Sequence, residues 1–291
     1  GYAEGDRVVL SFRACRTCRN CTGLGVGYCE NTVLLNYMGY RLDGSTTLTE
    51  GDAPVQASFF GQSSFARHAI VSPDNAVRVD PDADLTRLGP FGCAFQTGAG
   101  AVLNVLQPGA HDAVVVYGVG AVGLAAIATA RAQGVATVVA VDLKPERLDA
   151  AASLGATTVN PSELGDTGLP DRIRELTGGG ASHAVDTTGV GPVIRDGALA
   201  LRPRGTLVVL GLGAPEITFD AIDIMMNGKV VRGSVEGDSD PHATIPALIR
   251  MAQDGSFPVD QFISTYPFEE INRAAADLLS GAAIKPVLVW E

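Results

Sequence analysis

The segment Gly118-Val119-Gly120-Ala121-Val122-Gly123 decides the fold of this chain. It follows the apolar run 113–117 and precedes an alanine-rich stretch, so its G-x-G-x-x-G spacing falls at a turn from strand to helix. In such a turn the first glycine makes the bend, the second lets the backbone approach a pyrophosphate, and the third lets helix and strand pack closely. The helix N-terminus offers free N–H groups to the phosphates. The segment therefore predicts a dinucleotide-binding loop, with an ordinary glycine turn of an α/β domain as the alternative.

A pattern of β-branched run, turn and alanine-rich helix repeats from residue 112 onward. Strands are expected at 113–117, 137–141, 157–159, 183–186 and 206–210, and helices at 121–133, 145–154, 169–177 and 192–201. Pro145 and Pro192 lie at first helical turns, and Gly134 and Gly155 lie where helices end. Short strands separated by helices predict a parallel sheet that is covered on both faces.

Asp142 follows the second of these strands, about twenty residues after the last glycine of the loop. A carboxylate there accepts hydrogen bonds from the hydroxyls of an adenosine ribose. A 2′-phosphate about 4 Å away would be repelled by about 4 kcal/mol per unit charge, so the sequence favours NAD over NADP. Lys144 and Arg147 keep NADP open, because nearby cations relieve that repulsion.

The segments that flank this α/β unit do not show its regular alternation of strands and helices. Residues 6–80 predict short strands and irregular loops without a long helical period. The expected elements outside the unit are strands at 7–10, 65–71 and 286–290 and amphipathic segments at 242–253 and 268–279.

The composition predicts about two domains with a large apolar core. The chain has 291 residues, of which 46% are hydrophobic and 18% charged. Its net charge of −11 provides no broad positive field, so nucleic acid and acidic membrane surfaces are poor candidates for partners. The uncharged stretch 113–130 has the length of a membrane span, but glycines interrupt it where a turn is expected. We therefore interpret it as a strand followed by a helix.

Four cysteines, Cys15, Cys18, Cys21 and Cys29, have the spacing C-x2-C-x2-C-x7-C. This spacing lets four thiolates converge on one ion, which is the ligand set of a closed, structural zinc site in a small lobe at 13–30. An iron–sulfur cluster is the alternative, although ferredoxin runs continue with x3-C-P and this one does not. Two disulfides are disfavoured by crowding at this spacing and by the lack of a secretion signal. The cysteines therefore predict a reducing, cytoplasmic compartment.

These features together resemble the medium-chain zinc-dependent alcohol dehydrogenases. The resemblance is carried by the four-cysteine lobe, the glycine loop and the stretch Gly92-Cys93-Ala94-Phe95-Gln96-Thr97-Gly98-Ala99-Gly100. Three further stretches are similar to the aryl-alcohol (benzyl-alcohol) branch: Phe-Gly-Gln-Ser-Ser-Phe at 60–65, Gln-Thr-Gly-Ala-Gly-Ala-Val-Leu-Asn at 96–104 and Val-Glu-Gly-Asp-Ser at 235–239. The resemblance extends from Gly5 to Trp290.

The resemblance implies an α/β fold in which a Rossmann doubly wound parallel sheet is inserted in a GroES-like, mainly β catalytic domain with a zinc lobe. The implied units are a catalytic part at 1–95, a Rossmann NAD-binding domain at 96–235 and a C-terminal return to the catalytic domain at 236–291. Homodimers or homotetramers are the implied assemblies.

Carried over residue by residue, the resemblance assigns the cysteine cluster to structural zinc and makes Cys93 a thiolate ligand of a second, catalytic zinc. Thr97 resembles the threonine that packs against the nicotinamide. Asp142 and Arg147 match the pair that holds the adenosine ribose, and Lys285 aligns with a basic residue near the pyrophosphate. An ordinary buried thiol is the alternative for Cys93.

The chain departs from the family at the catalytic zinc. In the family, that metal takes a first cysteine and a Gly-His-Glu histidine from the N-terminal part of the chain. Here no cysteine precedes Cys15, and none of the histidines lies in such a motif; they are His68, His111, His183 and His242. One thiolate cannot hold a zinc that needs three protein ligands. Either a further N-terminal segment supplies the missing ligands, as the start without Met suggests, or the protein has lost its catalytic metal.

Three functional hypotheses follow from the sequence. The first is an NAD-dependent alcohol dehydrogenase, in which zinc acts as a Lewis acid on the alcohol and the nicotinamide accepts a hydride, giving the aldehyde. The chain of 291 residues by itself is then expected to be inactive. Candidates for an aromatic pocket that takes an aryl or benzyl alcohol, or else for core positions, are Tyr37, Phe59, Phe60 and Phe91. The second function is a non-catalytic dinucleotide-binding protein, and an iron–sulfur electron carrier is a third.

Overall fold

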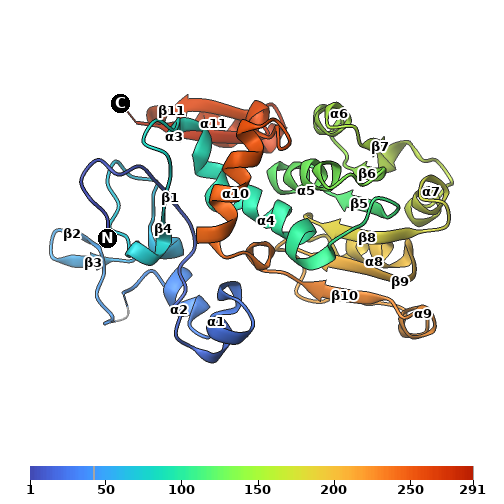
Figure 1. The fold of residues 1–291 in the computed structure, drawn as a ribbon, viewed down its shortest axis with the longest axis horizontal. Coiled ribbons are helices and arrows are strands. Elements are labelled where there is room, and N and C mark those ends of the chain that lie inside the picture. The colour runs from blue at the N-terminus through green and yellow to red at the C-terminus, as the bar shows by residue number, and fades with distance from the viewer. Residues whose placement is uncertain (42, 291) are drawn as a thin grey trace.

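The computed structural model describes residues 1–41 and 43–290 as two lobes that lie side by side. Figure 1 shows the middle of the chain as one lobe, with helices around a central sheet. The blue N-terminal and red C-terminal segments together form the other lobe. This arrangement confirms the predicted architecture, in which a Rossmann sheet lies between two parts of a second, partly β lobe with a four-cysteine cluster.

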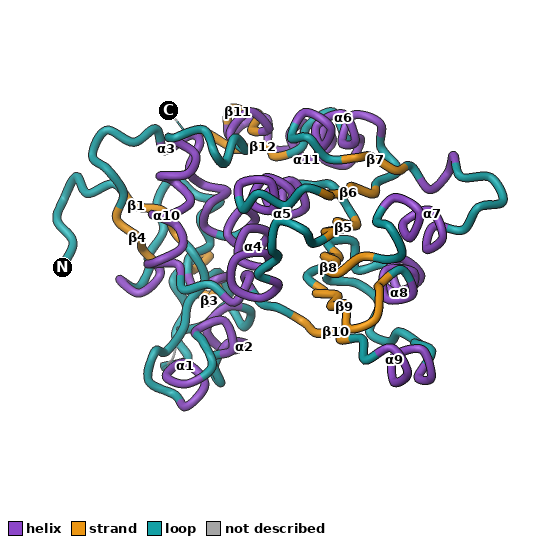
Figure 2. The backbone as a smooth tube through the Cα atoms, turned by 45° about the vertical axis from the view of Figure 1, so that its right-hand side comes forward, coloured by secondary structure: helices purple, strands orange, loops and turns teal. Residues whose placement is uncertain are grey.

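The Rossmann lobe is built on six parallel strands in the order β10-β9-β8-β5-β6-β7. These strands are β5 (Ala113–Tyr117), β6 (Thr137–Val141), β7 (Thr157–Val159), β8 (Ala181–Asp186), β9 (Leu201–Val209) and β10 (Val230–Gly233). Figure 2 shows them stacked from β7 to β10 across the lobe. The strand order reverses between β5 and β8, so the carboxyl ends of these two strands border the crevice in which such folds bind ligands.

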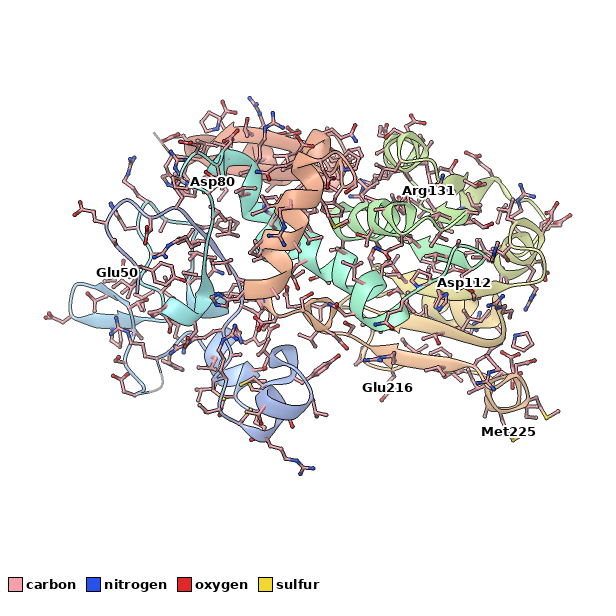
Figure 3. The ribbon with its side chains drawn as sticks, in the orientation of Figure 1. Glu50, Asp80, Asp112, Arg131, Glu216 and Met225 are labelled. Atoms are coloured by element: carbon pink, nitrogen blue, oxygen red, sulfur yellow. The ribbon has the colours of Figure 1, made fainter. Side chains whose placement is uncertain are left out.

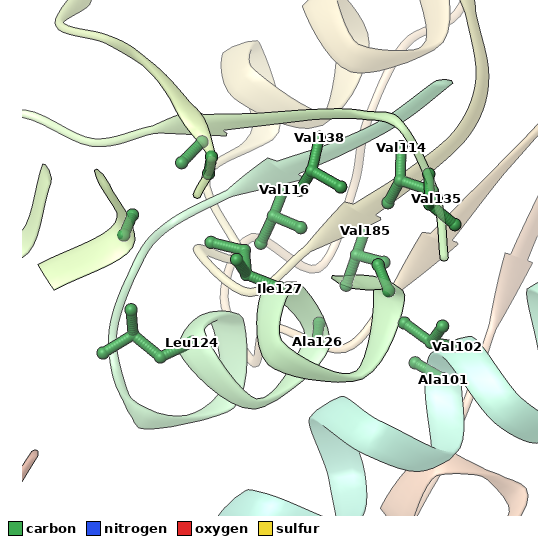
Figure 4. Packing of buried hydrophobic residues seen from close by; sticks show 14 of the residues in the cluster. Ala101, Val102, Val114, Val116, Leu124, Ala126, Ile127, Val135, Val138 and Val185 are labelled. Atoms are coloured by element: carbon green, nitrogen blue, oxygen red, sulfur yellow. The ribbon is translucent and has the colours of Figure 1, made fainter. Parts of the chain in front are cut away.

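Five helices belong to the same lobe: α5 (Ala121–Ala132), α6 (Pro145–Ser153), α7 (Leu169–Leu176), α8 (Gly191–Leu199) and α9 (Ala221–Asn227). Successive side chains of a strand point to opposite faces, so one fully buried strand feeds two cores. Val114 and Val116 of β5 pack toward Ile127 of α5 (Figure 4), whereas Tyr117 joins Ile194 of α8 on the other face. Each buried side chain of this size contributes about 1.5–3 kcal/mol. The predicted doubly covered sheet is therefore confirmed.

The stretch 113–130 forms β5, the glycine loop and most of α5, as the strand-and-helix interpretation predicted. Across residues 1–41 and 43–290, no helix combines the length and the apolar character needed to cross a bilayer.

The second lobe combines short strands with helices from both ends of the chain. Its strand pairs are antiparallel β1 (Val8–Leu10) with β4 (Ala76–Arg78), antiparallel β2 (Leu48–Glu50) with β3 (Ala53–Val55), and parallel β11 (Ile263–Pro267) with β12 (Lys285–Val289). Its helices are α1 (Arg19–Gly23), α2 (Thr32–Asn36), α3 (Leu85–Leu88), α4 (Ala94–Gly100), α10 (Pro241–Gln253) and α11 (Ile271–Ser280). The strand predicted at 65–71 is wrong, because that segment is irregular and mostly exposed and pairs with no strand of the described chain. The strand that pairs with β1 comes later, at β4.

Helix α4 connects the two lobes and continues as a π-helical turn, Ala101–Leu106. At Gly98 the helix touches α5 backbone to backbone, since a Cβ there would lie 2.0 Å from the carbonyl oxygen of Val122. On the other side of α4, Phe95 packs edge-on against Phe91 and Phe257, with ring centroids 5.2 Å and 6.2 Å apart. Phe91 is only 1% exposed, so its candidacy for the aromatic pocket is wrong and its alternative as a core residue holds.

Candidate dinucleotide and metal sites

The four clustered cysteines converge on one point in the second lobe. Their sulfur atoms all lie within 4.8 Å of one another, and Cys15 Sγ is 4.0 Å from Cys21 Sγ. Tetrahedral zinc with Zn–S bonds of about 2.3 Å requires sulfur–sulfur separations of about 3.8 Å, so a single ion fits between them. A disulfide needs its two sulfurs about 2 Å apart, and all five cysteines are free thiols. The predicted four-cysteine zinc site is therefore formed.

Backbone N–H groups point at these sulfurs and favour the thiolate form. Cys18 Sγ accepts a hydrogen bond from Cys21 N at 3.4 Å, and Cys29 Sγ accepts one from Cys15 N at 3.3 Å. Backbone hydrogen bonds from Thr17 and Cys18 are the main reason that the pKa of Cys15 falls to about 5. Burial instead raises the pKa of Cys21 to about 12, a thiol that a bound cation would deprotonate.

The glycine loop between β5 and α5 has three glycines in three different surroundings. Gly118 has φ 84°, which favours glycine, and a Cβ there would lie 2.5 Å from Thr187 Oγ1. A Cβ at Gly123 would lie 2.0 Å from the Gly118 carbonyl oxygen. At Gly120, by contrast, a Cβ would meet nothing within 4 Å. Gly120 is also the N-cap of α5, and no side chain caps the first N–H groups of this twelve-residue helix, as binding of a pyrophosphate there requires.

Asp142, the predicted ribose acceptor, organises the loop through backbone hydrogen bonds. Its Oδ2 accepts a hydrogen bond from Val119 N at 2.7 Å, and its Oδ1 accepts one from Lys144 N at 2.9 Å. Arg147 Nη1 is 3.8 Å from Asp142 Oδ2, while Arg147 Nε is buried without a hydrogen-bond partner among the described residues. A buried unpaired donor costs about 1–3 kcal/mol, so this corner has an unused place for a ligand acceptor. The Lys144 ammonium already donates to the Leu279 carbonyl oxygen at 2.6 Å.

Cys93 and Thr97 lie one turn apart at the start of α4, and a carboxylate joins them. The Cys93 thiol donates to Glu236 Oε1 at 3.3 Å. Thr97 Oγ1 is 2.8 Å from the Cys93 carbonyl oxygen and 3.2 Å from Glu236 Oε2. Gln96 Nε2 also donates to Glu236 Oε2, at 3.1 Å. Three side chains of one helix are thus held by a single residue that follows β10.

Sequence reasoning missed Glu236 as a site residue. It is buried in a loop, and its partners lie about 140 positions earlier in the chain. A lone acid in a loop gives no periodic signal, and only the similarity of the stretch 235–239 marked the region. Burial raises the pKa of Glu236, although hydrogen bonds from Cys93, Thr97 and Gln96 oppose the rise.

The electrostatics of Cys93 reflect the same neighbours. Although the residue keeps some solvent access, desolvation of its sulfur and then the negative charge of Glu236 raise the pKa of Cys93 to about 12. The Lys285 ammonium, on β12, acts in the opposite direction and lowers that pKa. Lys285 is itself desolvated, which lowers its own pKa. Lys285, which the resemblance places near the pyrophosphate, thus also acts electrostatically on the Cys93 thiol. Its contact with a cofactor stays a prediction.

The described residues do not assemble a complete catalytic zinc site. Among them, the four-cysteine cluster is the only group of three or more metal-binding side chains. Glu236 is the one ligand-type side chain in hydrogen-bond contact with Cys93, whereas a catalytic zinc needs three protein ligands. Two of the histidines are engaged elsewhere: His242 Nε2 is 3.2 Å from the Asp74 carbonyl oxygen, and His183 Nδ1 is 3.1 Å from Ser182 Oγ.

Three of the four predicted pocket aromatics form a cluster on the Cys93 side of the lobe. The ring of Tyr37 is 6.0 Å from that of Phe59 and 5.9 Å from that of Phe60, and the two phenylalanine rings are 5.1 Å apart. Tyr37 and Phe59 are about half exposed, so the cluster is open to a ligand. Desolvation and then the negative charges of Glu236 and Cys93 raise the pKa of Tyr37.

Known proteins are similar to this chain over nearly its whole length. The family model described as zinc-binding dehydrogenase matches residues 121–254. Geraniol dehydrogenase from Castellaniella defragrans is 42% identical over 290 residues, a match that covers 98% of this chain and 77% of the relative.

Two solved structures extend the comparison to three dimensions. An alcohol dehydrogenase zinc-binding domain protein from Burkholderia ambifaria superposes with a TM-score of 0.94 at 42% identity, over 99% of this chain and 78% of the other. Benzyl alcohol dehydrogenase from Acinetobacter calcoaceticus superposes with a TM-score of 0.92 at 37% identity, over 98% and 78% of the two chains. The chain therefore belongs to the medium-chain zinc-dependent alcohol dehydrogenases.

Proposed function

We propose that this protein transfers a hydride between a primary alcohol and NAD and forms the aldehyde. The observation that carries the proposal is the open, uncapped N-terminus of α5, which is joined by the Gly98 contact to the helix that bears Cys93 and Thr97. The packed helices α4 and α5 thereby connect the proposed pyrophosphate site to the proposed reaction site. The domain boundaries at 96 and 235 belong to the same proposal, and both lie beside the Cys93–Glu236 contact.

The chain's own side chains divide the work of binding. Gly120 leaves room for the pyrophosphate at the helix N-terminus, and Asp142 accepts from the adenosine ribose, which favours NAD. Thr97 packs against the nicotinamide ring, and Lys285 adds positive charge near the phosphates. Holding the nicotinamide ring and the carbinol carbon in contact accounts for much of the rate gain in such reactions.

A catalytic zinc, when bound, supplies Lewis-acid chemistry at the alcohol oxygen. Cys93 is the ligand that this chain offers to it, and the described residues do not complete the set. A non-catalytic dinucleotide-binding protein is therefore the second candidate function, because the incomplete ligand set favours it.

The relatives support the choice of substrate. Geraniol and benzyl alcohol, after which two of them are named, are primary alcohols whose carbinol carbon adjoins an sp² carbon. The aromatic cluster of Tyr37, Phe59 and Phe60 offers flat apolar faces to such a carbon skeleton. We therefore propose aryl or allylic primary alcohols as the substrate class.

Exposed apolar side chains support a homodimer built through the Rossmann sheet. β10 is an edge strand of that sheet, and Ile222, Met225 and Met226 of the adjacent helix α9 are each about 70% exposed. Met225 projects from the end of the molecule in Figure 3. An edge strand with apolar neighbours is a template for pairing with a second copy, and a two-fold axis there would join two sheets. A homotetramer would add a second interface to this dimer.

The proposal is tested by following NADH formation spectrophotometrically with the full-length protein, zinc, NAD and either benzyl alcohol or geraniol. We expect turnover of both alcohols, faster with NAD than with NADP. NADH binding without turnover of any primary alcohol would support the non-catalytic alternative. Absence of NADH binding would overturn both candidates.

A further inference from the structure

The loop that follows β10 contains three consecutive residues in the left-handed region. Glu236 has φ 52°, Gly237 has φ 67° and Asp238 has φ 52°. For the two residues with a side chain this conformation costs about 1–2 kcal/mol each. Such strain persists only where the surroundings fix the backbone, and it collects at functional sites.

On one side, the loop is fixed by the four-cysteine lobe. The Tyr28 hydroxyl, next to the ligand Cys29, donates to Asp238 Oδ1 at 2.6 Å. Gly27 lies so close that a Cβ there would be 2.9 Å from the Val235 carbonyl oxygen. The Asp238 carboxylate also accepts hydrogen bonds from Arg232 Nη2 of β10 at 2.8 Å and from Ser234 Oγ, directly after β10, at 2.7 Å.

On its other side, the loop is locked onto α4 and its π-helical continuation. Glu236 holds Cys93 and Thr97, as described above. A Cβ at Gly100 would lie 2.4 Å from the Gly237 carbonyl oxygen, which also accepts from Asn104 Nδ2 at 2.9 Å. The loop therefore has no room to move relative to the helix that carries the site.

A second pair of side chains also joins the four-cysteine lobe to this part of the chain. Arg16, between the ligands Cys15 and Cys18, makes two contacts with the Asp240 carboxylate at 3.0 Å and 3.3 Å. Asp240 caps α10 by accepting from His242 N at 3.1 Å. Arg16 is itself left-handed, with φ 56°, so the turn that bends the chain around the metal also aims this guanidinium.

We propose that the zinc-bound lobe positions the Cys93–Thr97 site through this loop. The metal orders Tyr28 and Arg16, these hold residues 236–240 in place, and the left-handed loop presents Glu236 to α4. Tyr28 and Glu236 are thus positioning residues, and the lobe has a role in the reaction site beyond local stability. The inference rests on the proposed hydride-transfer site, because Cys93 and Thr97 belong to it.

The test removes one hydroxyl from the path. Tyr28→Phe deletes the hydrogen bond to Asp238 and leaves the ring in place. Tyr266→Phe is the matched control, because the Tyr266 hydroxyl of β11 also donates to an aspartate, Asp277 Oδ2 of α11 at 2.9 Å, and neither residue belongs to the path from the four-cysteine lobe to the loop.

Two readouts follow the site without requiring turnover. Within these 291 residues Cys93 is the single cysteine outside the cluster, so in this chain an aromatic disulfide reagent reacts with Cys93 alone while zinc protects the other four. NADH affinity is measured by nicotinamide fluorescence, and bound zinc is measured in parallel.

For Tyr28→Phe we expect full zinc occupancy, a Cys93 modification rate raised about fivefold, and NADH binding weakened by a similar factor, as loss of a hydrogen bond worth about 1 kcal/mol gives. Glu236→Gln should produce the same changes, and Tyr266→Phe should produce neither.

A Tyr28→Phe protein that matches the wild type and Tyr266→Phe in Cys93 reactivity would overturn the proposal. A change in these two readouts in Glu236→Gln but not in Tyr28→Phe would also overturn the proposal, because the loop would then hold α4 without the four-cysteine lobe. If Tyr28→Phe loses its zinc, Arg16→Gln decides in the same two assays. If even the wild type fails to bind NADH, the proposed function fails, while the thiol rates still decide the positioning role.

Discussion

The replacement of Gly120 by alanine separates the folding role of the glycine loop from its ligand-binding role. Gly120 has φ −79° and ψ −167°, a backbone conformation that alanine adopts without strain. A methyl group there meets no protein atom within 4 Å. It would instead extend into open space at the uncapped N-terminus of α5, where the pyrophosphate is expected.

The two effects differ in size. Restricting the unfolded chain stabilises Gly120→Ala by about 0.4–1 kcal/mol, and the poorer N-cap offsets a similar amount, so the free energy of unfolding should stay within about 1 kcal/mol of wild type. Blocking one hydrogen bond to a charged phosphate costs about 1.5–3 kcal/mol. NADH affinity should therefore fall by about 10- to 150-fold.

The assay pairs urea unfolding with NADH titration, and Gly123→Ala serves as the contrasting variant. A Cβ at Gly123 would lie 2.0 Å from the Gly118 carbonyl oxygen and 3.2 Å from Val116 Cγ1, so that variant should lose about 1–3 kcal/mol of stability. A Gly120→Ala protein that binds NADH as tightly as wild type would refute the placement of the pyrophosphate at this helix.

The remaining predictions concern the metal, the cofactor and the assembly. Cys21→Ser should lose the lobe zinc and lower the thermal midpoint, because a closed site needs all four sulfurs; unchanged metal content would contradict this. Asp142→Ala should weaken NAD binding and raise the affinity for NADP relative to that for NAD. Asp142→Asn keeps an acceptor for Val119 N, so its glycine loop should stay better ordered. An unchanged ratio of NAD to NADP affinity in titrations would count against the ribose assignment. Met225→Glu should dissociate the dimer in light scattering and Leu279→Glu, an equally exposed leucine on α11, should not; equal masses for both would argue against the β10 interface.

The Rossmann lobe could be predicted closely from sequence because its signals are local. The strands expected at 113–117, 137–141 and 157–159 coincide with β5, β6 and β7. β-Branched residues dominate these runs, and glycine or proline bounds them. β10 and α9 were not predicted, since their residues are largely exposed and show no comparable pattern.

The second lobe and the reaction site depend on contacts that no local pattern records. The segment 65–71 resembles a strand in composition, yet a strand also needs a partner, and β1 pairs with β4 instead. The spacing of the cysteines predicted their convergence because four ligands lie within one short loop. Glu236 could not be found this way, because its meaning comes from Cys93 and Thr97, which the fold brings to it.

The contact at Gly98 bears on how proteins of this fold can diverge. Because α4 and α5 meet through main-chain atoms at Gly98, replacements of side chains elsewhere on the two helices leave their spacing unchanged. On the proposed function, residues around the alcohol site can then change while the distance between that site and the cofactor stays constant. New substrate preferences can therefore arise by point mutation without a change in the position of the cofactor.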